Sequence, residues 1–165
     1  GGDLSQVVTE ATVVWGDGRE QRLTREEIGF GYRSTRLQGT SAIVVEVVMA
    51  LRPADPAALM GAMRQHLDRR RATQPLQYPN AGSIFKNPPG DYAGRLIEQA
   101  GLKGERVGDA QVSEKHANFI VNLGQATAKD VLTLMDRVRS TVQQRFGVRL
   151  EAEVKIWGPN PCFLP

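Results

Sequence analysis

The segment Gly82-Ser83-Ile84-Phe85-Lys86-Asn87-Pro88 constrains the fold of this chain more than any other stretch. It opens with a glycine, leads into a Pro-Pro-Gly break, and brings a hydroxyl, an ammonium and an amide together within seven residues. Because proline and glycine interrupt regular helices and strands, the segment is predicted to be a loop that presents polar groups to a ligand. A segment of this kind is unsuited to filling a hydrophobic core.

The first part of the chain has the pattern of a β-hairpin followed by another strand. Glu10–Trp15 and Arg19–Leu23 flank the turn sequence Gly16-Asp17-Gly18, and the first of these runs is rich in β-branched residues. Such runs around an Asp-Gly turn predict a hairpin with one exposed edge. The other features predicted here are a short helix begun by capping-box spacing at Thr24–Glu27, an irregular stretch at Phe30–Ser34, and a strand at Ala42–Leu51.

A helix is predicted to follow the break at Pro53–Pro56. Asp55 has the position of an N-cap and Pro56 that of the first helical residue, and the helical pattern fades near Arg71. Its apolar residues recur at helical spacing and are predicted to face a core: Leu59, Met60, Met63 and Leu67. The polar, proline-containing segment 72–81 is predicted to be an extended loop.

Beyond the polar loop, the pattern predicts a small α+β domain. The predicted helices are Tyr92–Ala100, closed by Gly101, and Thr127–Arg145, closed by Gly147. The predicted strands are Gln111–Val112, Phe119–Leu123 and Val148–Trp157. This order of elements indicates helices packed on one face of a small sheet, with a domain boundary near Leu51–Pro56.

Composition narrows the class of protein. With 165 residues, 41% of them hydrophobic and 24% charged, the chain fits one compact domain or a small domain plus part of another. The formal net charge of +3 does not by itself indicate nucleic-acid binding, although a basic RNA-binding domain stays open as an alternative.

The single cysteine, Cys162, excludes an intrachain disulfide and favours a reducing compartment. His66 and His116 lack zinc-ligand spacing, and no apolar run approaches the ~20 residues needed to span a bilayer.

Ser83 is the first candidate for chemistry, and its surroundings argue against a serine hydrolase. The chain has no Gly-x-Ser-x-Gly motif, and spacing ties neither histidine to this serine. A hydroxyl is a poor acid, so it can donate a proton only to a strongly basic group such as a forming carbanion or enolate. The alternative is a turn hydroxyl with a structural role.

Cationic and amide side chains near Ser83 indicate a possible anion site. Lys86 and Asn87 precede a predicted helix start, and Lys103 follows the end of the same helix. Free N–H groups and the helix dipole favour anions at such a start. Ordinary solvated lysines are the alternative.

Charged side chains suited to ligand contacts occur in two more places. Arg33 lies in the irregular stretch, where its guanidinium suits a carboxylate, a phosphate or an ordinary surface salt bridge. Glu151 and Glu153 are predicted to share one face of the last strand, where one of two neighbouring carboxyls can have a perturbed pKa. Paired glycosidase acids flank the scissile bond from opposite sides, so they fit this arrangement less well than a solvated strand face does.

Taken together, these motifs resemble the UDP-N-acetylenolpyruvoylglucosamine reductase family, flavoenzymes also called UDP-N-acetylmuramate dehydrogenases. The resemblance covers Gly1 to about Gly158 and is carried by the following segments, in the family's order: Phe30-Gly31-Tyr32-Arg33-Ser34, Gly82-Ser83-Ile84-Phe85-Lys86-Asn87-Pro88, Ala93-Gly94-Arg95-Leu96-Ile97-Glu98, Gly101-Leu102-Lys103-Gly104, His116-Ala117-Asn118-Phe119-Ile120-Val121-Asn122 and Leu150-Glu151-Ala152-Glu153-Val154. Any one motif is unspecific, whereas the ordered set is highly specific. The segment between Arg33 and Ala42 lacks the tyrosine-bearing insertion of one subclass, so the chain resembles the shorter subclass.

The resemblance implies a division of the chain into parts of two domains. Residues 1–52 are expected to close a flavin-binding domain made of strands and a short helix, residues 53–158 to form a small α+β substrate-binding domain, and residues 159–165 to be a tail. The family's Gly-rich flavin loop is expected upstream of Gly1. The chain is therefore expected to be a C-terminal portion that holds FAD poorly and is inactive alone.

The activity that the resemblance implies is reduction of the enolpyruvyl group of a UDP-sugar, which gives UDP-N-acetylmuramate for peptidoglycan synthesis. In the family, NADPH reduces FAD, hydride passes to the enolpyruvyl double bond, and an enolate-like intermediate takes a proton. By resemblance Ser83 is the proton donor, while Arg33 and Glu153 hold and polarise the substrate carboxyl. The residues expected to contact the substrate are Asn87, Lys103, Lys86, His116 and Tyr32, and those expected to contact the cofactor are Gly1, Gly2 and Arg33.

The resemblance also leads us to expect a cytoplasmic bacterial monomer that acts on a UDP-sugar, with no metal, nucleic acid or membrane partner. A non-catalytic nucleotide-sugar binding module, with the same anion site and no redox activity, stays open as the alternative. The presence or absence of a Gly-rich flavin loop upstream would separate the two.

Overall fold

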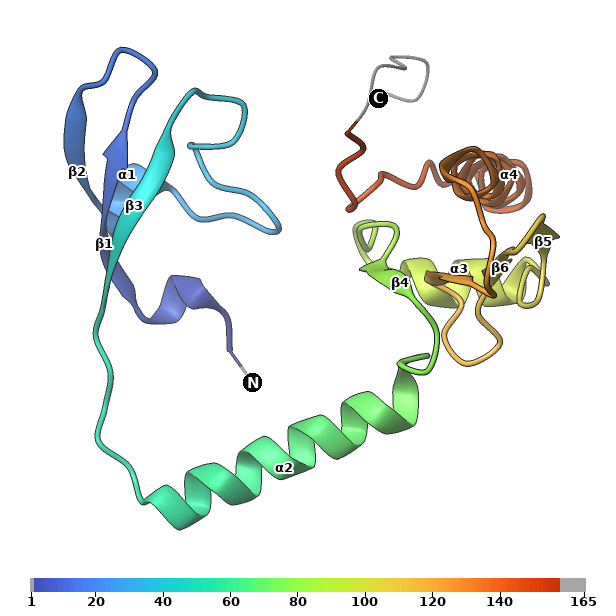
Figure 1. Cartoon of the computed structure of the whole chain (residues 1–165), viewed down its shortest axis with the longest axis horizontal. Helices are drawn as coiled ribbons and strands as arrows, with labels where there is room; N and C mark the ends of the chain where they lie inside the picture. Colours follow the sequence, from blue (N-terminus) through green and yellow to red (C-terminus); the bar gives the residue numbers. More distant parts are fainter. Residues whose placement is uncertain (1, 158–165) are drawn as a thin grey trace. The chain divides into compact units, whose positions relative to one another are not determined.

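The computed structural model describes residues 2–157, which fold into two compact units (Figure 1). The first unit extends to Leu59 and the second begins at Met60. Gly1, Cys162 and the rest of the predicted tail lie outside the described residues. Strands and helices occur together in the chain, which confirms the predicted α+β class.

The first unit is built on an antiparallel sheet in the order β2-β1-β3. Its elements are the 3-10 helix η1 (Leu4–Gln6), the strands β1 (Val8–Val14) and β2 (Glu20–Thr24), the short helix α1 (Arg25–Ile28) and the strand β3 (Ile43–Met49). The predicted hairpin is confirmed, because β1 and β2 pair from Glu10 opposite Thr24 to Val14 opposite Glu20. The predicted capping box is also confirmed, since Glu27 N–H donates to Thr24 Oγ1 at 3.3 Å and Thr24 N–H donates to the Glu27 carboxylate at 2.7 Å.

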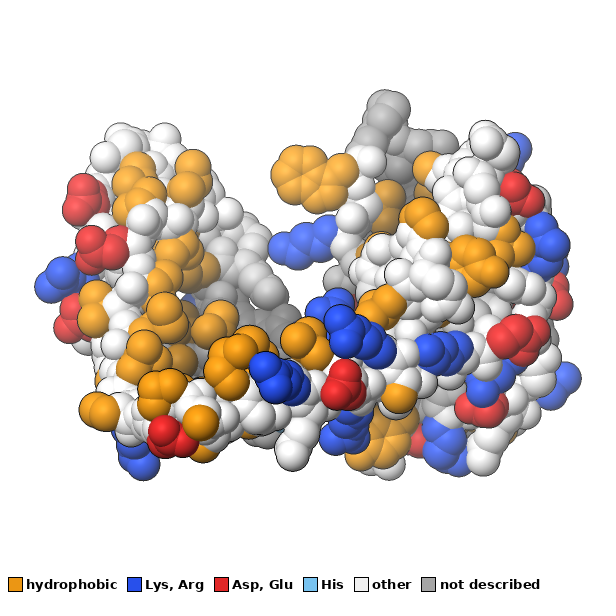
Figure 2. Space-filling model, turned by 60° about the horizontal axis from the view of Figure 1, so that its bottom comes forward, with side chains coloured by type: hydrophobic (Ala, Val, Ile, Leu, Met, Phe, Trp, Pro, Cys, Tyr) orange, Lys and Arg blue, Asp and Glu red, His pale blue; other side chains and the backbone are white. Residues whose placement is uncertain are grey.

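Strand β3 is exposed along its whole length, although its sequence is almost entirely apolar. Ile43 is 65% exposed and Val48, the least exposed of its large apolar residues, is still 38% exposed. Figure 2 shows apolar side chains gathered on the surface of this unit. The strand lies at the edge of the sheet and pairs with β1. The small core of the unit is therefore made by other residues: Val8, Ala11, Val13, Leu23 and Ile28.

Helix α2 (Pro56–Thr73) starts as predicted, since Ala58 N–H donates to the Asp55 carboxylate at 2.9 Å. The prediction that its apolar stripe belongs to a core is wrong, because the helix contains no buried residue. The stripe residues are between 43% and 57% exposed: Leu59, Met60, Met63 and Leu67. Helical spacing identifies side chains that share a face, but burial also needs a second element packed on that face.

The second unit contains an antiparallel sheet in the order β4-β7-β6-β5. Its elements are β4 (Asn80–Ser83), α3 (Ala93–Gln99), β5 (Arg106–Val107), β6 (Ala110–Val112), β7 (Phe119–Asn122) and α4 (Ala128–Phe146). Both predicted helices are present, and α4 begins where Asp130 N–H donates to Thr127 Oγ1 at 3.2 Å.

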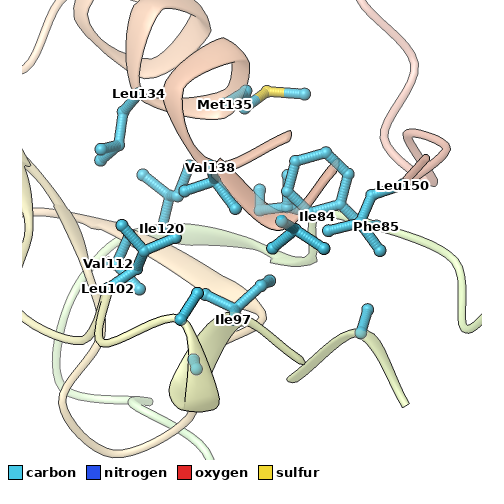
Figure 3. Close-up of a cluster of buried hydrophobic side chains, with 14 of the residues drawn as sticks. Ile84, Phe85, Ile97, Leu102, Val112, Ile120, Leu134, Met135, Val138 and Leu150 are labelled. Carbon is cyan, nitrogen blue, oxygen red and sulfur yellow. The ribbon is translucent and has the colours of Figure 1, made fainter. Parts of the chain in front are cut away.

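The core of the second unit joins both helices to the sheet. Figure 3 shows Leu134 and Val138 on the side of α4 that faces Ile120 of β7 and Ile84, and Met135 of α4 and Ile97 of α3 belong to the same cluster. Leu134 has no exposed surface and Ile97 has 1%. The loop residues Ile84 and Phe85 are part of this cluster, so the polar loop is anchored in the core by its two apolar side chains.

The last strand predicted from sequence, Val148–Trp157, is absent from the structure. This segment is irregular and makes one isolated β-bridge, between Ala152 and Phe85. Leu150 is buried but Ala152 is exposed, so the side chains do not alternate as a strand requires. Conversely, β4 lies in residues that were predicted to be loop, because its sequence Asn-Ala-Gly-Ser carries no strand pattern. These residues form a strand because they pair with β7.

Candidate functional site

A pocket of about 420 Å³ opens beside Ser83 in the second unit. Ser83 is the last residue of β4, and its partner on β7 is Phe119. The pocket is lined by Ser83, Asn87, Tyr92, Gly94, Arg95, Glu98, Lys115, His116, Ala117 and Asn118. Three of the residues predicted from sequence thus share one pocket: Ser83, Asn87 and His116.

The loop that follows Ser83 is held on one side by Asn118. Ile84 N–H donates to the Asn118 carbonyl at 2.9 Å. The Asn118 side chain accepts a bond from Phe85 N–H at 3.0 Å and donates one to the Phe85 carbonyl at 2.8 Å. Because Asn118 is 4% exposed, these bonds are shielded from water.

The loop is held on the other side by the segment that contains both predicted carboxylates. Glu153 N–H donates to the Ile84 carbonyl at 2.7 Å, and Lys86 N–H donates to the Glu151 carbonyl at 2.8 Å. The Lys86 ammonium also lies 3.3 Å from the Glu151 carboxylate. The structure therefore brings Glu153 next to the loop that begins at Ser83, and it engages Glu151 with Lys86.

Asn87 caps helix α3, which changes the anion site predicted at this helix start. Ala93 N–H donates to Asn87 Oδ1 at 3.1 Å, so the side chain of the loop occupies one of the N–H groups predicted to be available for an anion. The other predicted cation, Lys103, donates to Glu98 Oε1 at 2.6 Å, and Glu98 lines the pocket. The charges that reach the pocket are thus mixed in sign.

His116 lies half-buried between the pocket and Phe119, with the two ring centroids 4.8 Å apart. Burial lowers the pKa of His116 below its ordinary value, and the nearby Lys103 ammonium lowers it further. Asn118 N–H donates to His116 Nδ1 at 3.2 Å. A ring nitrogen that accepts a bond carries no proton, so the neutral ring holds its proton on Nε2 and acts there as a donor.

Tyr32 and Arg33 form the tip of a tight turn in the first unit. Gly31 N–H donates to the Ser34 carbonyl at 2.9 Å and Ser34 N–H donates back at 3.2 Å. Arg33 has a φ of 53°, in the left-handed region that side chains rarely adopt. Its guanidinium lies 5.9 Å from the centre of the Tyr32 ring. A strained turn that presents a cation and an aromatic ring side by side is a reasonable candidate for a functional position.

This turn lines an open concavity of about 1100 Å³ that belongs to the first unit. Gly2 lies on the same concavity, whereas Gly1, the other predicted cofactor contact, is outside the described residues. A Cβ at Gly31 would meet Ser34 Oγ at 2.7 Å, so the turn is closed too tightly for a side chain there. The predicted site residues are thus found in two separate groups, one in each unit.

Several residues of the Ser83 pocket were not predicted as site residues. Tyr92, Arg95 and Glu98 follow each other at a spacing of three along α3 and its N-cap, so the predicted helix already placed them on one face. Arg95 donates to Asp91 Oδ1 at 2.7 Å and lowers the pKa of that carboxyl. Asn118 has no sequence signal of its own, because its role depends on contacts between distant segments.

Comparison with known proteins identifies the family. Residues 74–157 match the family model described as the C-terminal domain of UDP-N-acetylenolpyruvoylglucosamine reductase. The chain belongs to the UDP-N-acetylenolpyruvoylglucosamine reductase family.

Relatives of this family are similar along almost the whole chain. UDP-N-acetylenolpyruvoylglucosamine reductase 2 of Symbiobacterium thermophilum is 87% identical over all 165 residues, which are 54% of its own length. The reductase of Moorella thermoacetica is 51% identical over 95% of the chain and 52% of its own length. The crystal structure of the reductase of Thermus caldophilus matches with a TM-score of 0.81 at 43% identity, over 95% of this chain and 55% of that one.

The chain thus spans about half the length of the reductases that it matches. The resemblance read from the sequence motifs is confirmed, including its assignment to the C-terminal portion of the reductase. Residues 2–157 contain no group of three or more histidine, cysteine, aspartate or glutamate side chains placed to hold a metal ion. Nor is any helix within this range both long and apolar enough to cross a membrane.

Proposed function

We propose that this chain supplies the substrate side of a UDP-N-acetylenolpyruvoylglucosamine reductase, which reduces the enolpyruvyl group of UDP-N-acetylglucosamine enolpyruvate to UDP-N-acetylmuramate. The observation that carries the proposal is the position of Ser83 at the mouth of a pocket, on a loop bonded directly to the backbone of Glu153. Membership of the reductase family supports it.

Ser83 is proposed to be the proton donor. Reduction adds a hydride to one carbon of the enolpyruvyl double bond and leaves an enolate-like centre on the other. Such a carbon is basic enough to take the proton of a hydroxyl, and the serine then regains a proton from water. Ser83 is half-buried at the pocket, which suits a group that must reach a bound substrate while bulk water is kept away.

Arg33 and Glu153 are proposed to hold and polarise the substrate carboxyl while negative charge builds on it. The backbone bond from Glu153 N–H to the Ile84 carbonyl, which brings Glu153 next to the loop that begins at Ser83, supports this role for Glu153. For Arg33 the support is the family resemblance and the strained turn that presents its guanidinium.

The UDP group is proposed to be bound by the polar side chains of the second unit, with a contribution from Tyr32. The residues assigned to it are Asn87, Lys103, Lys86, His116 and Tyr32. Support comes from the Nε2 donor of His116 in the pocket and from the Lys103 ammonium beside the pocket residue Glu98. A diphosphate carries negative charge that such donors stabilise.

FAD and NADPH are the proposed cofactors. FAD, when bound, supplies the hydride, and NADPH is the reductant that restores it. The residues of the first unit fit a planar group with carbonyl oxygens, since Arg33 and Tyr32, which both line the concavity, offer donors and a ring face. Most of the FAD contacts are assigned to the part of the relatives that this chain does not match, so the chain alone is expected to be inactive. The enzyme is proposed to be a cytoplasmic bacterial monomer.

The test uses one polypeptide that combines this chain with the part of the Symbiobacterium thermophilum relative that the chain does not match, hereafter the joined protein. It should show flavin absorbance, and NADPH should reduce its flavin. Ser83→Ala should leave that reduction unchanged but slow flavin reoxidation by the enolpyruvyl substrate by about 10²- to 10⁴-fold. Ser140→Ala, at an exposed position of α4, is the matched control. Turnover of Ser83→Ala near that of the parent would exclude the proton-donor role.

A non-catalytic nucleotide-sugar binding module is the second candidate. It is favoured by one observation, namely that the Ser83 pocket is lined by residues of the second unit alone. The joined protein separates the candidates, because a binding module would retain UDP-sugar without reducing it in the presence of NADPH.

A further inference from the structure

We propose that Asn118 is a positioning residue for this site: its side-chain amide acts as a strand partner for Phe85 and thereby fixes the loop that begins at Ser83, while its backbone N–H orients the His116 ring. The inference rests on the proposed function, because Ser83 and His116 are its proposed site residues. Asn118 itself is assigned no chemical step.

The Asn118 amide has the geometry of a strand partner. Its Oδ1 accepts from Phe85 N–H at 3.0 Å and its Nδ2 donates to the Phe85 carbonyl at 2.8 Å. A side chain that satisfies both the N–H and the C=O of one residue reproduces the paired bonds of an antiparallel strand. Only asparagine and glutamine carry a donor and an acceptor that can do this while uncharged, and glutamine is longer by one methylene.

The Asn118 amide acts near the point where the pairing of two strands ends. The pairing of β4 with β7 ends at Ser83 opposite Phe119. Beyond that pair, Phe119 N–H donates to the His116 carbonyl at 3.0 Å, so the backbone of the partner strand turns away. The backbone supplies one more bond, from Ile84 N–H to the Asn118 carbonyl, and the Asn118 side chain then extends the pairing to Phe85. Ser83 is therefore the last residue of β4, and the two residues that follow it are held by hydrogen bonds to Asn118.

Asn118 also orients His116, through its backbone. The backbone N–H of Asn118 donates to His116 Nδ1 at 3.2 Å, which leaves the proton of the neutral ring on Nε2. Asn118 lies two residues after His116, and its amide bonds a residue that lies two positions after Ser83. Small displacements of reacting groups slow catalysis strongly, so loss of the side-chain bonds to the Ser83 loop should have a large effect on rate. The backbone bond to His116 is kept when the Asn118 side chain is changed.

Asn122, the last residue of β7, provides a matched control. Its Oδ1 accepts from Gly124 N–H at 2.8 Å and from Ala126 N–H at 3.0 Å, so it also holds a backbone segment. Asn122 does not line the Ser83 pocket. Loss of either amide removes two hydrogen bonds to the backbone, but only Asn118 bonds the loop that carries the proposed chemistry.

The experiment compares Asn118→Leu, Asn118→Asp and Asn122→Leu in the joined protein. Asn118→Leu should slow flavin reoxidation by the enolpyruvyl substrate about 10- to 100-fold, with flavin reduction by NADPH within about twofold of the parent. Asn118→Asp keeps the acceptor for Phe85 N–H and should recover part of the rate. Asn122→Leu should lower the thermal midpoint without slowing reoxidation. Equal slowing by both leucine variants, or reoxidation within about twofold of the parent in Asn118→Leu, would overturn the proposal.

A second readout does not depend on activity. In this chain, Asn118→Leu should speed hydrogen exchange of the Phe85 amide about tenfold or more relative to the core amides of α4, because its acceptor is gone. Unchanged exchange at Phe85 would refute the positioning bond itself. Absence of turnover in the parent joined protein would instead count against the proposed function, and the exchange result would still decide whether Asn118 holds the loop.

Discussion

The backbone N–H of Glu153 donates a hydrogen bond of 2.7 Å to the carbonyl of Ile84, the residue that follows Ser83. Two residues from distant parts of the chain, both proposed to act in one reaction, are thus tied together through main-chain atoms. Because the tie does not use the Glu153 side chain, the carboxylate can be changed while the backbone contact is kept.

Glu153→Gln in the joined protein is expected to lower kcat by about 10²-fold or more, because an amide, unlike a carboxyl group, cannot exchange a proton with the substrate carboxyl as negative charge builds there. Glu151→Gln is the control, since that carboxylate lies 3.3 Å from the Lys86 ammonium and forms an exposed ion pair. Steady-state kinetics would measure both. A larger loss in Glu151→Gln would show that the wrong carboxylate has been assigned.

Lys103→Ala is expected to raise the KM for the UDP-sugar about tenfold and to change kcat less. The ammonium bonds Glu98 at the pocket, so its removal leaves a carboxylate that repels a diphosphate, and this affects substrate and transition state alike. Lys129→Ala, on the exposed first turn of α4, should change neither value. A fall in kcat at constant KM would contradict a binding role for Lys103.

His116 should make the stability of the chain depend on pH. Burial lowers its pKa in the folded state below the ordinary value of 6.5, so the unfolded state binds the proton more readily. The free energy of unfolding is therefore highest above the pKa that His116 has in the unfolded state. It decreases as the pH falls from that value through the lower pKa of the folded state. Denaturant titrations between about pH 5 and 7 should therefore give a steeper rise in unfolding free energy for the parent than for His116→Gln.

The control for that experiment is His66→Gln, on the exposed helix α2. Because this variant retains His116, it should keep the pH dependence of the parent. Parallel curves for the parent and His116→Gln would argue that the ring is not buried as described.

Leu134→Ala is expected to lower the free energy of unfolding of the second unit by about 2–5 kcal/mol, because Leu134 has no exposed surface and its loss leaves a cavity under α4. Leu67→Ala, on the stripe of α2, should cost less than about 1 kcal/mol, since Leu67 is 43% exposed. Chemical denaturation of the two variants would test this. Comparable losses would indicate that the α2 stripe is buried in solution.

Local chemistry explains which elements could be predicted. The hairpin β1–β2, the caps at Thr24 and Thr127, and the helices α3 and α4 depend on turn residues, hydroxyl caps and helical spacing that lie close together in the sequence. Each of these signals acts over a few residues, so the pattern alone was enough.

The features that were missed depend on contacts between distant segments. Strand β4 exists because β7 pairs with it, and the predicted strand at Val148–Trp157 fails because the loop beyond Ser83 offers it only the bridge between Phe85 and Ala152. The same limit applies to the site. Ser83, Asn87 and His116 could be named from motifs, but the two-bond contact of Asn118 could not be read from its neighbours.

The left-handed backbone at Arg33 has a consequence for how this protein evolves. Glycine adopts that conformation without the steric cost of about 1–2 kcal/mol that a side chain carries. Its unfolded chain has more conformational freedom, so folding costs a comparable amount of additional entropy. The backbone effects of Arg33→Gly should therefore nearly cancel, so its effect on the free energy of unfolding measures what the Arg33 side chain contributes to the fold, including its contact with the Tyr32 ring. A lineage that retained arginine at this tip although Arg33→Gly is neutral for folding would be retaining the guanidinium for another purpose.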